Sequence, residues 1–176
     1  IHALVDIDSE AAKQAVIQLS DMMRYVVYGA GDDAIALKND LTFIENYIEL
    51  MRIRYTDDVE IVYNRPERLS SNIEIPPLIF IVFVENAFKH GVSYDSASYI
   101  HIDISYEEDF VVGRFENSVH PNKRSGNPGI GLENVRKRLD LIYNNHYNLQ
   151  IDESDKNYCI TLKIPTLNSY EMHRDR

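Results

Sequence analysis

Apolar residues in the N-terminal part of the chain recur at intervals of four and three, the spacing of one helical face. The first stripe consists of Ala12, Val16, Leu19, Met23 and Val26, and the second of Leu37, Leu41, Ile44, Ile48, Met51 and Tyr55. A short polar turn at residues 29–33 separates them, so we expect an antiparallel helical hairpin. One hairpin encloses two stripes poorly, and a second copy would complete a four-helix bundle. The alternative is that these helices pack against the rest of their own chain.

From about Val59 the pattern changes to short runs that mix strands with helices. Isoleucines at 100, 102 and 104 alternate with polar residues, as on a half-buried strand, and residues 110–115 can pair with them across a turn at 107–109. Further strands are predicted at residues 61–63, 73–75, 149–151 and 158–164, and helices at residues 77–91 and 131–143. Helices on one face of a mixed sheet form a two-layer α/β sandwich. The predicted fold class is therefore α+β.

These patterns divide the chain into a helical hairpin at residues 1–56, an α/β domain at residues 57–167 and a solvated tail at residues 168–176. The formal net charge of −10 argues against a nucleic-acid surface, which carries a basic footprint. Cys159 is the only cysteine, so the chain has no internal disulfide. No apolar run approaches the length of a membrane span.

The predicted helix at 77–91 is apolar until its last turns, which carry Glu85, Asn86, Lys89, His90 and then Gly91. Residues four apart share a helical face, so a carboxylate lies near an ammonium and a carboxamide near an imidazole. Such a group can hold a hydrated metal ion and the phosphates attached to it. The alternative is a core helix with a polar last turn and a glycine cap.

A glycine-rich turn, Gly126-Asn127-Pro128-Gly129-Ile130-Gly131, leads into the predicted helix at 131–143. Glycines let the backbone approach a phosphate, and a helix N-terminus offers free N–H groups to an anion. Arg136 and Arg138 add positive charge nearby. Alone, this pattern is also that of an ordinary loop before a helix.

Together these two segments resemble the catalytic region of sensor histidine kinases of the LytS/YehU type, within the superfamily of gyrase-like and MutL-like ATPases. The resemblance rests on an asparagine box at residues 85–91 and a second glycine box at residues 129–139. It extends to residues 19–25 and 47–55 of the helical hairpin, and so covers nearly the whole chain.

The resemblance implies a Bergerat-type ATP site between the helices, beneath a mobile lid, with ATP and Mg²⁺ as cofactors. Asn86 would coordinate the Mg²⁺ that bridges the ATP phosphates, since a neutral oxygen suits that ion. Glu85 would accept a proton from the attacking imidazole, or else serve as a structural partner of Lys89. The residues expected to contact ATP are Asn86, Lys89, His90, Glu116, Asn117, Gly129, Gly131, Leu132 and Arg136.

Two departures from the superfamily bear on ATP affinity. Its Asp-x-Gly-x-Gly box for adenine corresponds here to residues 116–120, which read Glu-Asn-Ser-Val-His. Glu116 or Asn117 can still accept a hydrogen bond from the adenine amino group. Loss of both glycines, however, restricts the approach of the backbone to the base. Where the family commonly has Gly-Thr before its last strand, this chain has Asn157-Tyr158.

The family's phosphoacceptor histidine is expected about nine residues before Ile1, a distance of about 13 Å along a helix. His2 does not replace it, because its neighbours do not match the acceptor motif. We therefore expect a piece of a longer receptor, the cytoplasmic part of an inner-membrane sensor, which binds nucleotide but does not phosphorylate itself on that histidine.

The expected function is histidine kinase activity in a two-component system. The expected partners are a second copy bound through the helical hairpin and a response regulator, with no nucleic acid and no direct membrane contact. The alternative is a pseudokinase, a dimeric interaction module with weakened nucleotide binding. An anti-sigma-factor kinase of the same superfamily is disfavoured by the heptad hairpin.

Overall fold

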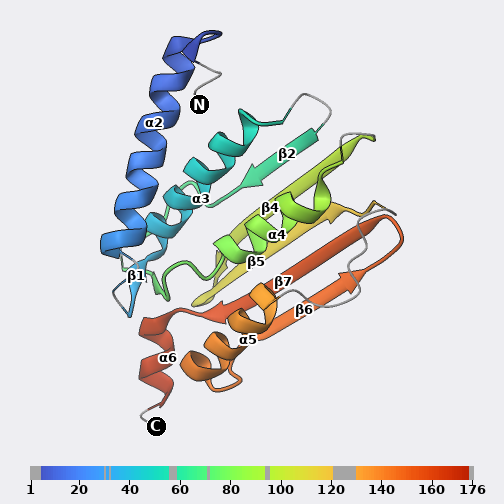
Figure 1. Ribbon diagram of the computed structural model, residues 1–176. Helices are drawn as coiled ribbons and strands as arrows, with labels where there is room; N and C mark the ends of the chain where they lie inside the picture. Colours follow the sequence, from blue (N-terminus) through green and yellow to red (C-terminus); the bar gives the residue numbers. More distant parts are fainter. Residues whose placement is uncertain are drawn as a thin grey trace.

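The computed structural model describes residues 5–29, 31, 33–55, 59–70, 72–93, 96–120 and 130–174. Figure 1 shows an N-terminal pair of helices that leads into a sheet with further helices on it. The helices are α2 (Ser9–Arg24), the π-helical turn η1 (Tyr25–Gly29), α3 (Leu37–Arg52), α4 (Ile81–Gly91), α5 (Ile130–Tyr143) and α6 (Leu167–Arg174). The strands are β1 (Ile35–Ala36), β2 (Val59–Asn64), β3 (Glu74–Ile75), β4 (Ser98–Glu107), β5 (Phe110–Ser118), β6 (Asn148–Glu153) and β7 (Asn157–Pro165).

Helices α2 and α3 form the predicted antiparallel hairpin (Figure 1). The carboxylate of Asp8 caps α2 by accepting a hydrogen bond from the amide of Ala11 at 3.0 Å. Two small residues, Ala12 and Ala15, are buried at 3% and 0% exposure. Because small side chains let helices approach closely, these alanines bring α2 against its neighbour.

The two predicted apolar stripes have different surroundings. On α3, Leu37, Leu41, Ile44 and Ile48 are at most 1% exposed and belong to the main core. In the first stripe, Ala12 is buried, but Val16, Leu19 and Met23 of α2 and Val26 of η1 are between 40% and 60% exposed. The second stripe thus packs against its own chain, as the alternative had it, and the first is open beyond Ala12.

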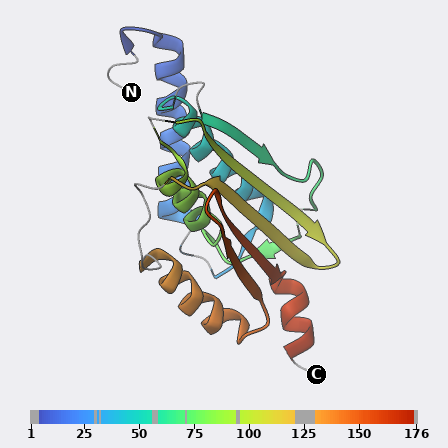
Figure 2. The same ribbon diagram turned by 90° about the vertical axis from the view of Figure 1, so that its right-hand side faces the viewer.

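The main sheet has the strand order β2-β4-β5-β7-β6, with β2 parallel to β4 and all other neighbours antiparallel. Helices α3, α4 and α5 lie on one face of this sheet, and the edge view in Figure 2 shows the two layers. The short strands β1 and β3 form a separate antiparallel pair. The predicted two-layer sandwich is confirmed, including the strand positions.

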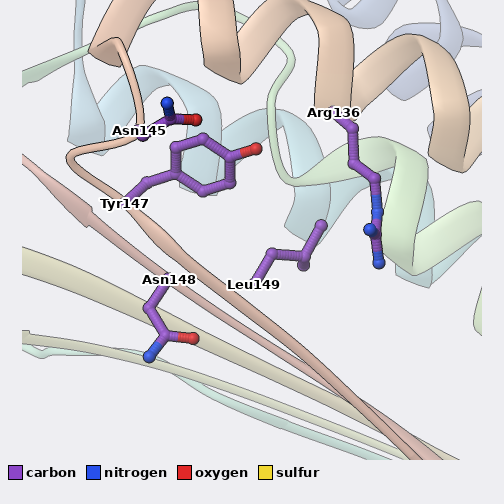
Figure 3. A pocket seen from close by; sticks show the side chains of 5 residues that line it. All are labelled: Arg136, Asn145, Tyr147, Asn148 and Leu149. Atoms are coloured by element: carbon purple, nitrogen blue, oxygen red, sulfur yellow. The ribbon is translucent and has the colours of Figure 1, made fainter.

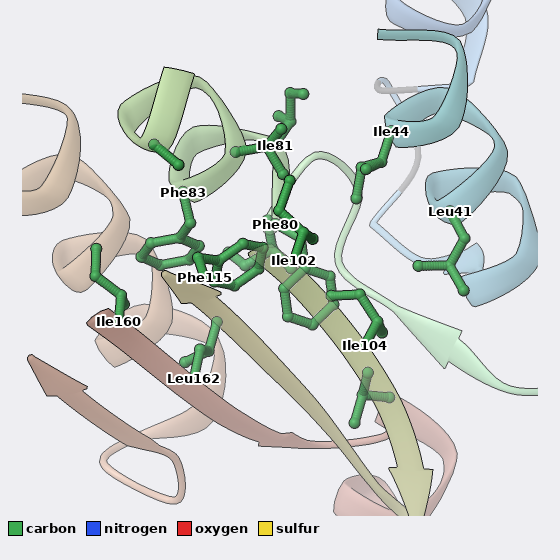
Figure 4. Packing of buried hydrophobic residues seen from close by; sticks show 14 of the residues in the cluster. Leu41, Ile44, Phe80, Ile81, Phe83, Ile102, Ile104, Phe115, Ile160 and Leu162 are labelled. Carbon is green, nitrogen blue, oxygen red and sulfur yellow. The ribbon is translucent and has the colours of Figure 1, made fainter. Parts of the chain in front are cut away.

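The core between sheet and helices is aromatic at its centre. Phe83 of α4 stacks on Phe115 of β5 with ring centroids 5.2 Å apart, and Phe80 lies against the same ring at 6.1 Å. Figure 4 shows these rings between isoleucines of the sheet and the apolar face of α3. This packing fixes α4, which carries the predicted asparagine box, on the middle of the sheet.

The segment after Pro165 differs from the predicted solvated tail. It forms α6, whose first turn is capped where Thr166 Oγ1 accepts a hydrogen bond from the Ser169 amide at 3.4 Å. Tyr170 packs edge-on against the buried ring of Tyr143, with centroids 5.3 Å apart. Its ring also lies 5.8 Å from that of His146, so a side-chain cap and these ring contacts extend the ordered structure beyond the last strand.

Asp40, in the first turn of α3, is a fully buried carboxylate at 0% exposure. Burial raises its pKa from the usual 3.8 to about 6, although hydrogen bonds from Leu78 and Tyr25 and the charge of Arg138 oppose that rise. The folded state therefore binds more protons than the unfolded state between these two values. The contribution of Asp40 to stability is full below the unfolded pKa and is lost as the pH rises through about 6.

We accordingly expect Asp40→Asn to gain stability relative to the wild type as the pH rises from 4 to 7.5. A shift of this size corresponds to a relative gain of about 3 kcal/mol over that range. Urea unfolding of both proteins at several pH values measures it. A stability difference between the two proteins that does not change with pH would contradict the buried, ionising carboxylate.

Candidate functional site

Helix α4 buries its apolar side in the core and turns its polar side chains outward. Glu85 and Lys89 are exposed, and Asn86 and His90 are partly exposed. The Glu85 carboxylate lies close enough to Tyr47 of α3 to affect its titration. Burial, first, and this negative charge, second, raise the pKa of Tyr47 to about 12. Tyr47 therefore borders the site as a neutral hydroxyl, and the sequence analysis did not single it out.

Gly91 ends α4 for a reason of space rather than of backbone conformation. A Cβ atom at this position would lie 2.5 Å from Cβ of Asn117. The helix ends at Val92 in an extended conformation, and Gly91 does not have a positive φ. A left-handed glycine cap is therefore not the explanation of Gly91. The missing side chain lets the end of β5 pack directly beneath the end of α4.

Ser118 and His120, which stand in the box where the superfamily has glycines, bond to this same helix end. The Ser118 hydroxyl donates to the Gly91 carbonyl at 2.7 Å, and His120 Nε2 lies 3.1 Å from the same oxygen. His120 Nε2 also lies 3.2 Å from the hydroxyls of Ser98 and Ser118, and Nδ1 lies 3.1 Å from the Ser96 hydroxyl. These residues fasten the end of β5 to α4, a role that the sequence analysis missed.

Of the two residues predicted to contact adenine, only Asn117 faces the helices. Successive side chains of a strand point to opposite faces, and Phe115 and Asn117 of β5 are buried on the helix side at 1% and 2% exposure. Glu116, between them, points to the other face. There it forms an ion pair with Arg114 and accepts a hydrogen bond from Asn157 at 3.0 Å. The Asn157 bond, more than Arg114, lowers the pKa of Glu116.

Helix α5 lies beside α4, and its apolar residues Leu132, Val135 and Leu139 are buried as predicted. Gly131 is exposed in its first turn, where a Cβ would lie 3.5 Å from Val82 of α4. The start of α5 therefore adjoins the helix that carries the polar group. Gly129, also predicted to contact ATP, lies outside the described residues.

Arg136 is directed toward the edge strand rather than toward α4. It lines an open hollow of about 340 Å³ together with Asn145, Tyr147, Asn148 and Leu149 (Figure 3). The lining contains no residue of α4. Tyr147 is held there by a hydrogen bond from its hydroxyl to Asp140 at 2.7 Å. The structure thus does not bring Arg136 together with Asn86 and Lys89.

Comparison with known proteins shows which proteins this chain resembles. A histidine kinase family model matches residues 1–59, which span the helical hairpin. Sensor protein LytS of Oceanobacillus iheyensis is 28% identical over 96% of this chain, and that of Staphylococcus epidermidis is 29% identical over 98%. The sensor histidine kinase YpdA of Escherichia coli is 26% identical over 81%. The chain is thus similar to LytS-type sensor histidine kinases over nearly its whole length.

The chain spans about a third of the length of these relatives, 31% of the Oceanobacillus protein and 32% of the Staphylococcus protein. Solved structures support the fold. The catalytic domain of histidine kinase ThkA, in a nucleotide-free form, superposes with a TM-score of 0.54 at 12% identity, covering 76% of this chain and 95% of that domain. The histidine kinase domain of Erythrobacter litoralis EL346 gives 0.55 at 11% identity, covering 97% and 88%.

In the part of the chain that the structure describes, every helix is too short or too polar to cross a membrane.

Proposed function

We propose that this chain is the ATP-binding catalytic part of a sensor histidine kinase, which transfers the γ-phosphoryl group of ATP to a histidine and then to a response regulator. The observation that carries the proposal is the outward polar face of α4 beside the glycine-led start of α5. Glu85, Asn86 and Lys89 are open to solvent there, on a helix that the core holds rigidly.

The available side chains fit Mg-ATP. Asn86 offers a neutral oxygen to the metal ion, as Mg²⁺ prefers, and it is partly exposed beside α5. Lys89 offers a cation to the phosphates, and the first turn of α5 offers free N–H groups to the same anion. Bound Mg²⁺ would supply neutralisation of phosphate charge. Asn117, the box residue on the helix side of β5, is the better placed of the two candidates for the adenine amino group.

Glu85 is the proposed proton acceptor for the attacking imidazole. Its carboxylate is exposed and lies near Tyr47 of α3, where an incoming imidazole can reach it. Phosphoryl transfer relies mainly on positioning and charge neutralisation, which Asn86 and Lys89 would supply.

The proposal is tested by autophosphorylation from radiolabelled ATP in a form of the protein that carries the acceptor histidine. Glu85→Gln is expected to slow this reaction by about 10²-fold, the lower range for loss of a general base, while leaving nucleotide affinity near that of the wild type. Glu107→Gln, an exposed glutamate at the far end of β4, is the matched control. Equal rates for both variants would remove Glu85 from the proposed chemistry.

The pseudokinase alternative has one specific observation in its favour. Ser118 and His120 stand where the superfamily's adenine box has glycines, and both contact the Gly91 carbonyl at the end of α4. The backbone at these two residues is therefore held away from an approach to the adenine ring. The two functions differ in a simple measurement, because a pseudokinase of this kind binds nucleotide weakly or not at all.

We further propose that the open stripe of α2 and η1, defined by Val16, Leu19, Met23 and Val26, pairs with the same stripe of a second copy. These side chains are 40–60% exposed in the single chain, and burying them between two hairpins removes apolar surface from water.

The double substitution Val16→Asp/Met23→Asp is expected to convert the dimer to a monomer in multi-angle light scattering, because it places charges in the proposed interface. Leu141→Asp, at an 86% exposed apolar residue of α5, is expected to leave the dimer intact. A wild-type chain that remains monomeric at high concentration would contradict the proposed bundle.

A further inference from the structure

Asp40 joins three segments that are distant in the sequence. Its Oδ1 accepts hydrogen bonds from the Tyr25 hydroxyl and from the Leu78 amide, each at 2.9 Å. Its Oδ2 is buried and has no hydrogen-bond partner among the residues that the structure describes. The nearby charge that acts on this carboxylate is that of Arg138 on α5.

The two partners of Asp40 belong to the helical hairpin and to the turn before α4. The position of α4 relative to the hairpin matters for the proposed phosphotransfer. Tyr25 opens the π-helical turn that ends α2, and its ring packs on Phe43 of α3 with centroids 4.9 Å apart. Leu78 lies in the turn that leads into α4. Oδ1 of Asp40 therefore bonds both to the residue that follows α2 and to the turn that precedes α4.

The turn before α4 needs such support. Leu78 has a φ of 56°, the left-handed region, which costs a residue other than glycine about 1–2 kcal/mol. The N-cap residue of α4 is Phe80, and no side chain caps this helix. The hydrogen bond from the Leu78 amide to Asp40 is thus a tertiary contact that holds the strained turn, and with it the start of α4.

A purely stabilising role does not account for this choice of residue. A buried carboxylate that leaves one oxygen unpaired is costly, and an apolar side chain of similar size would avoid that cost. Local conflicts of this kind concentrate where a residue serves function.

We infer that Asp40 is a positioning residue that couples the end of α2 to α4 and so sets where Glu85 and Asn86 stand. This inference rests on the proposed function for its nucleotide readout. Through Asp40, a displacement of Tyr25 at the end of the hairpin reaches the turn at Leu78. The polar face of α4 then moves with that turn.

The test is a double-mutant cycle on the whole chain with Tyr25→Phe, Asp40→Ala and their combination. Affinity for a non-hydrolysable ATP analogue with Mg²⁺ is measured by calorimetry, and amide hydrogen exchange is measured at residues 78–91. Tyr25→Phe is expected to weaken binding about threefold or more and to speed exchange at Leu78, because residues in one hydrogen-bond network are energetically coupled. Asp40→Ala is expected to weaken binding and speed exchange further. The double variant is expected to show the same affinity and exchange as Asp40→Ala alone.

Matched controls separate coupling from loss of fold. Tyr28→Phe removes a hydroxyl from the same π-helical turn at a 77% exposed residue, and Asn39→Ala changes an exposed neighbour of Asp40. Both should behave as the wild type. Asp40→Asn keeps an acceptor oxygen and should restore affinity and exchange to near the wild-type values. If Asp40→Ala does not fold, Tyr25→Phe is compared with Tyr28→Phe. The inference then requires weaker binding and faster exchange in Tyr25→Phe only, and equal behaviour of the two variants would overturn it.

Strictly additive effects of Tyr25→Phe and Asp40→Ala, or unchanged exchange at Leu78 in a folded Asp40→Ala, would overturn the inference. Failure of the proposed function gives a different result. The wild type then binds no nucleotide, while the exchange cycle at residues 78–91 still reports whether the coupling exists.

Discussion

Asn86→Ala is expected to abolish the Mg²⁺ dependence of nucleotide binding and to weaken binding of Mg-ATP by at least about tenfold. The carboxamide is the neutral oxygen that α4 offers to the ion, and loss of a bond to a charged group costs about 1.5–3 kcal/mol. For each protein, the affinity for an ATP analogue is measured by calorimetry once with Mg²⁺ and once with a chelator. The ratio of these two affinities is then compared between the variant and the wild type.

The control for this substitution is Asn39→Ala, an exposed asparagine on α3, which should retain the wild-type ratio. Asn86 points away from the core, so neither variant is expected to unfold the chain. An Asn86→Ala protein whose affinity still rises with Mg²⁺ as in the wild type would show that another group holds the ion.

Gly91→Ala is expected to destabilise the fold by about 1–3 kcal/mol, the usual cost of overpacking a core site. The added methyl group would lie 2.5 Å from Asn117 Cβ, closer than such atoms approach, so the end of α4 or of β5 must shift. Because Asn117 faces the proposed adenine site, the same shift should weaken nucleotide binding. Urea unfolding and calorimetry measure the two effects.

Gly131→Ala provides the contrast. A methyl group there meets only Val82, at an ordinary 3.5 Å, on an exposed helical turn. Alanine favours helix over glycine by about 1 kcal/mol, so this variant should be as stable as the wild type or more so. Removing the clash by combining Gly91→Ala with Asn117→Gly should recover part of the lost stability. A Gly91→Ala protein of wild-type stability would contradict the close packing described here.

The fold could be predicted from the sequence because most elements carry a clear period. Spacing of four and three marked both helices of the hairpin, and alternation at Ile100, Ile102 and Ile104 marked β4. Periodicity, however, shows that a face is buried and not what covers it. The stripes of α2 and α3 look alike in sequence, yet one faces the core and the other remains open.

The site was predictable residue by residue only in part. Alternation along β5 could have placed Asn117 and Glu116 on opposite faces of the sheet, because Asn117 is two residues from the apolar Phe115 and shares its face. Burial of Asp40 could not be foreseen, because an acidic residue in the first turn of a helix is ordinarily exposed and stabilises the helix dipole. Its partners Tyr25 and Leu78 are 15 and 38 residues away, and no local pattern links them. The position of Arg136 likewise depends on where β6 lies.

The central claim is that this chain binds Mg-ATP at the polar face of α4. Calorimetric titration of the wild-type chain with a non-hydrolysable ATP analogue, with and without Mg²⁺, tests it most directly. The outward polar face of α4 predicts saturable binding that strengthens when Mg²⁺ is present. Absence of heat at millimolar nucleotide with Mg²⁺ would contradict the kinase assignment and favour the pseudokinase.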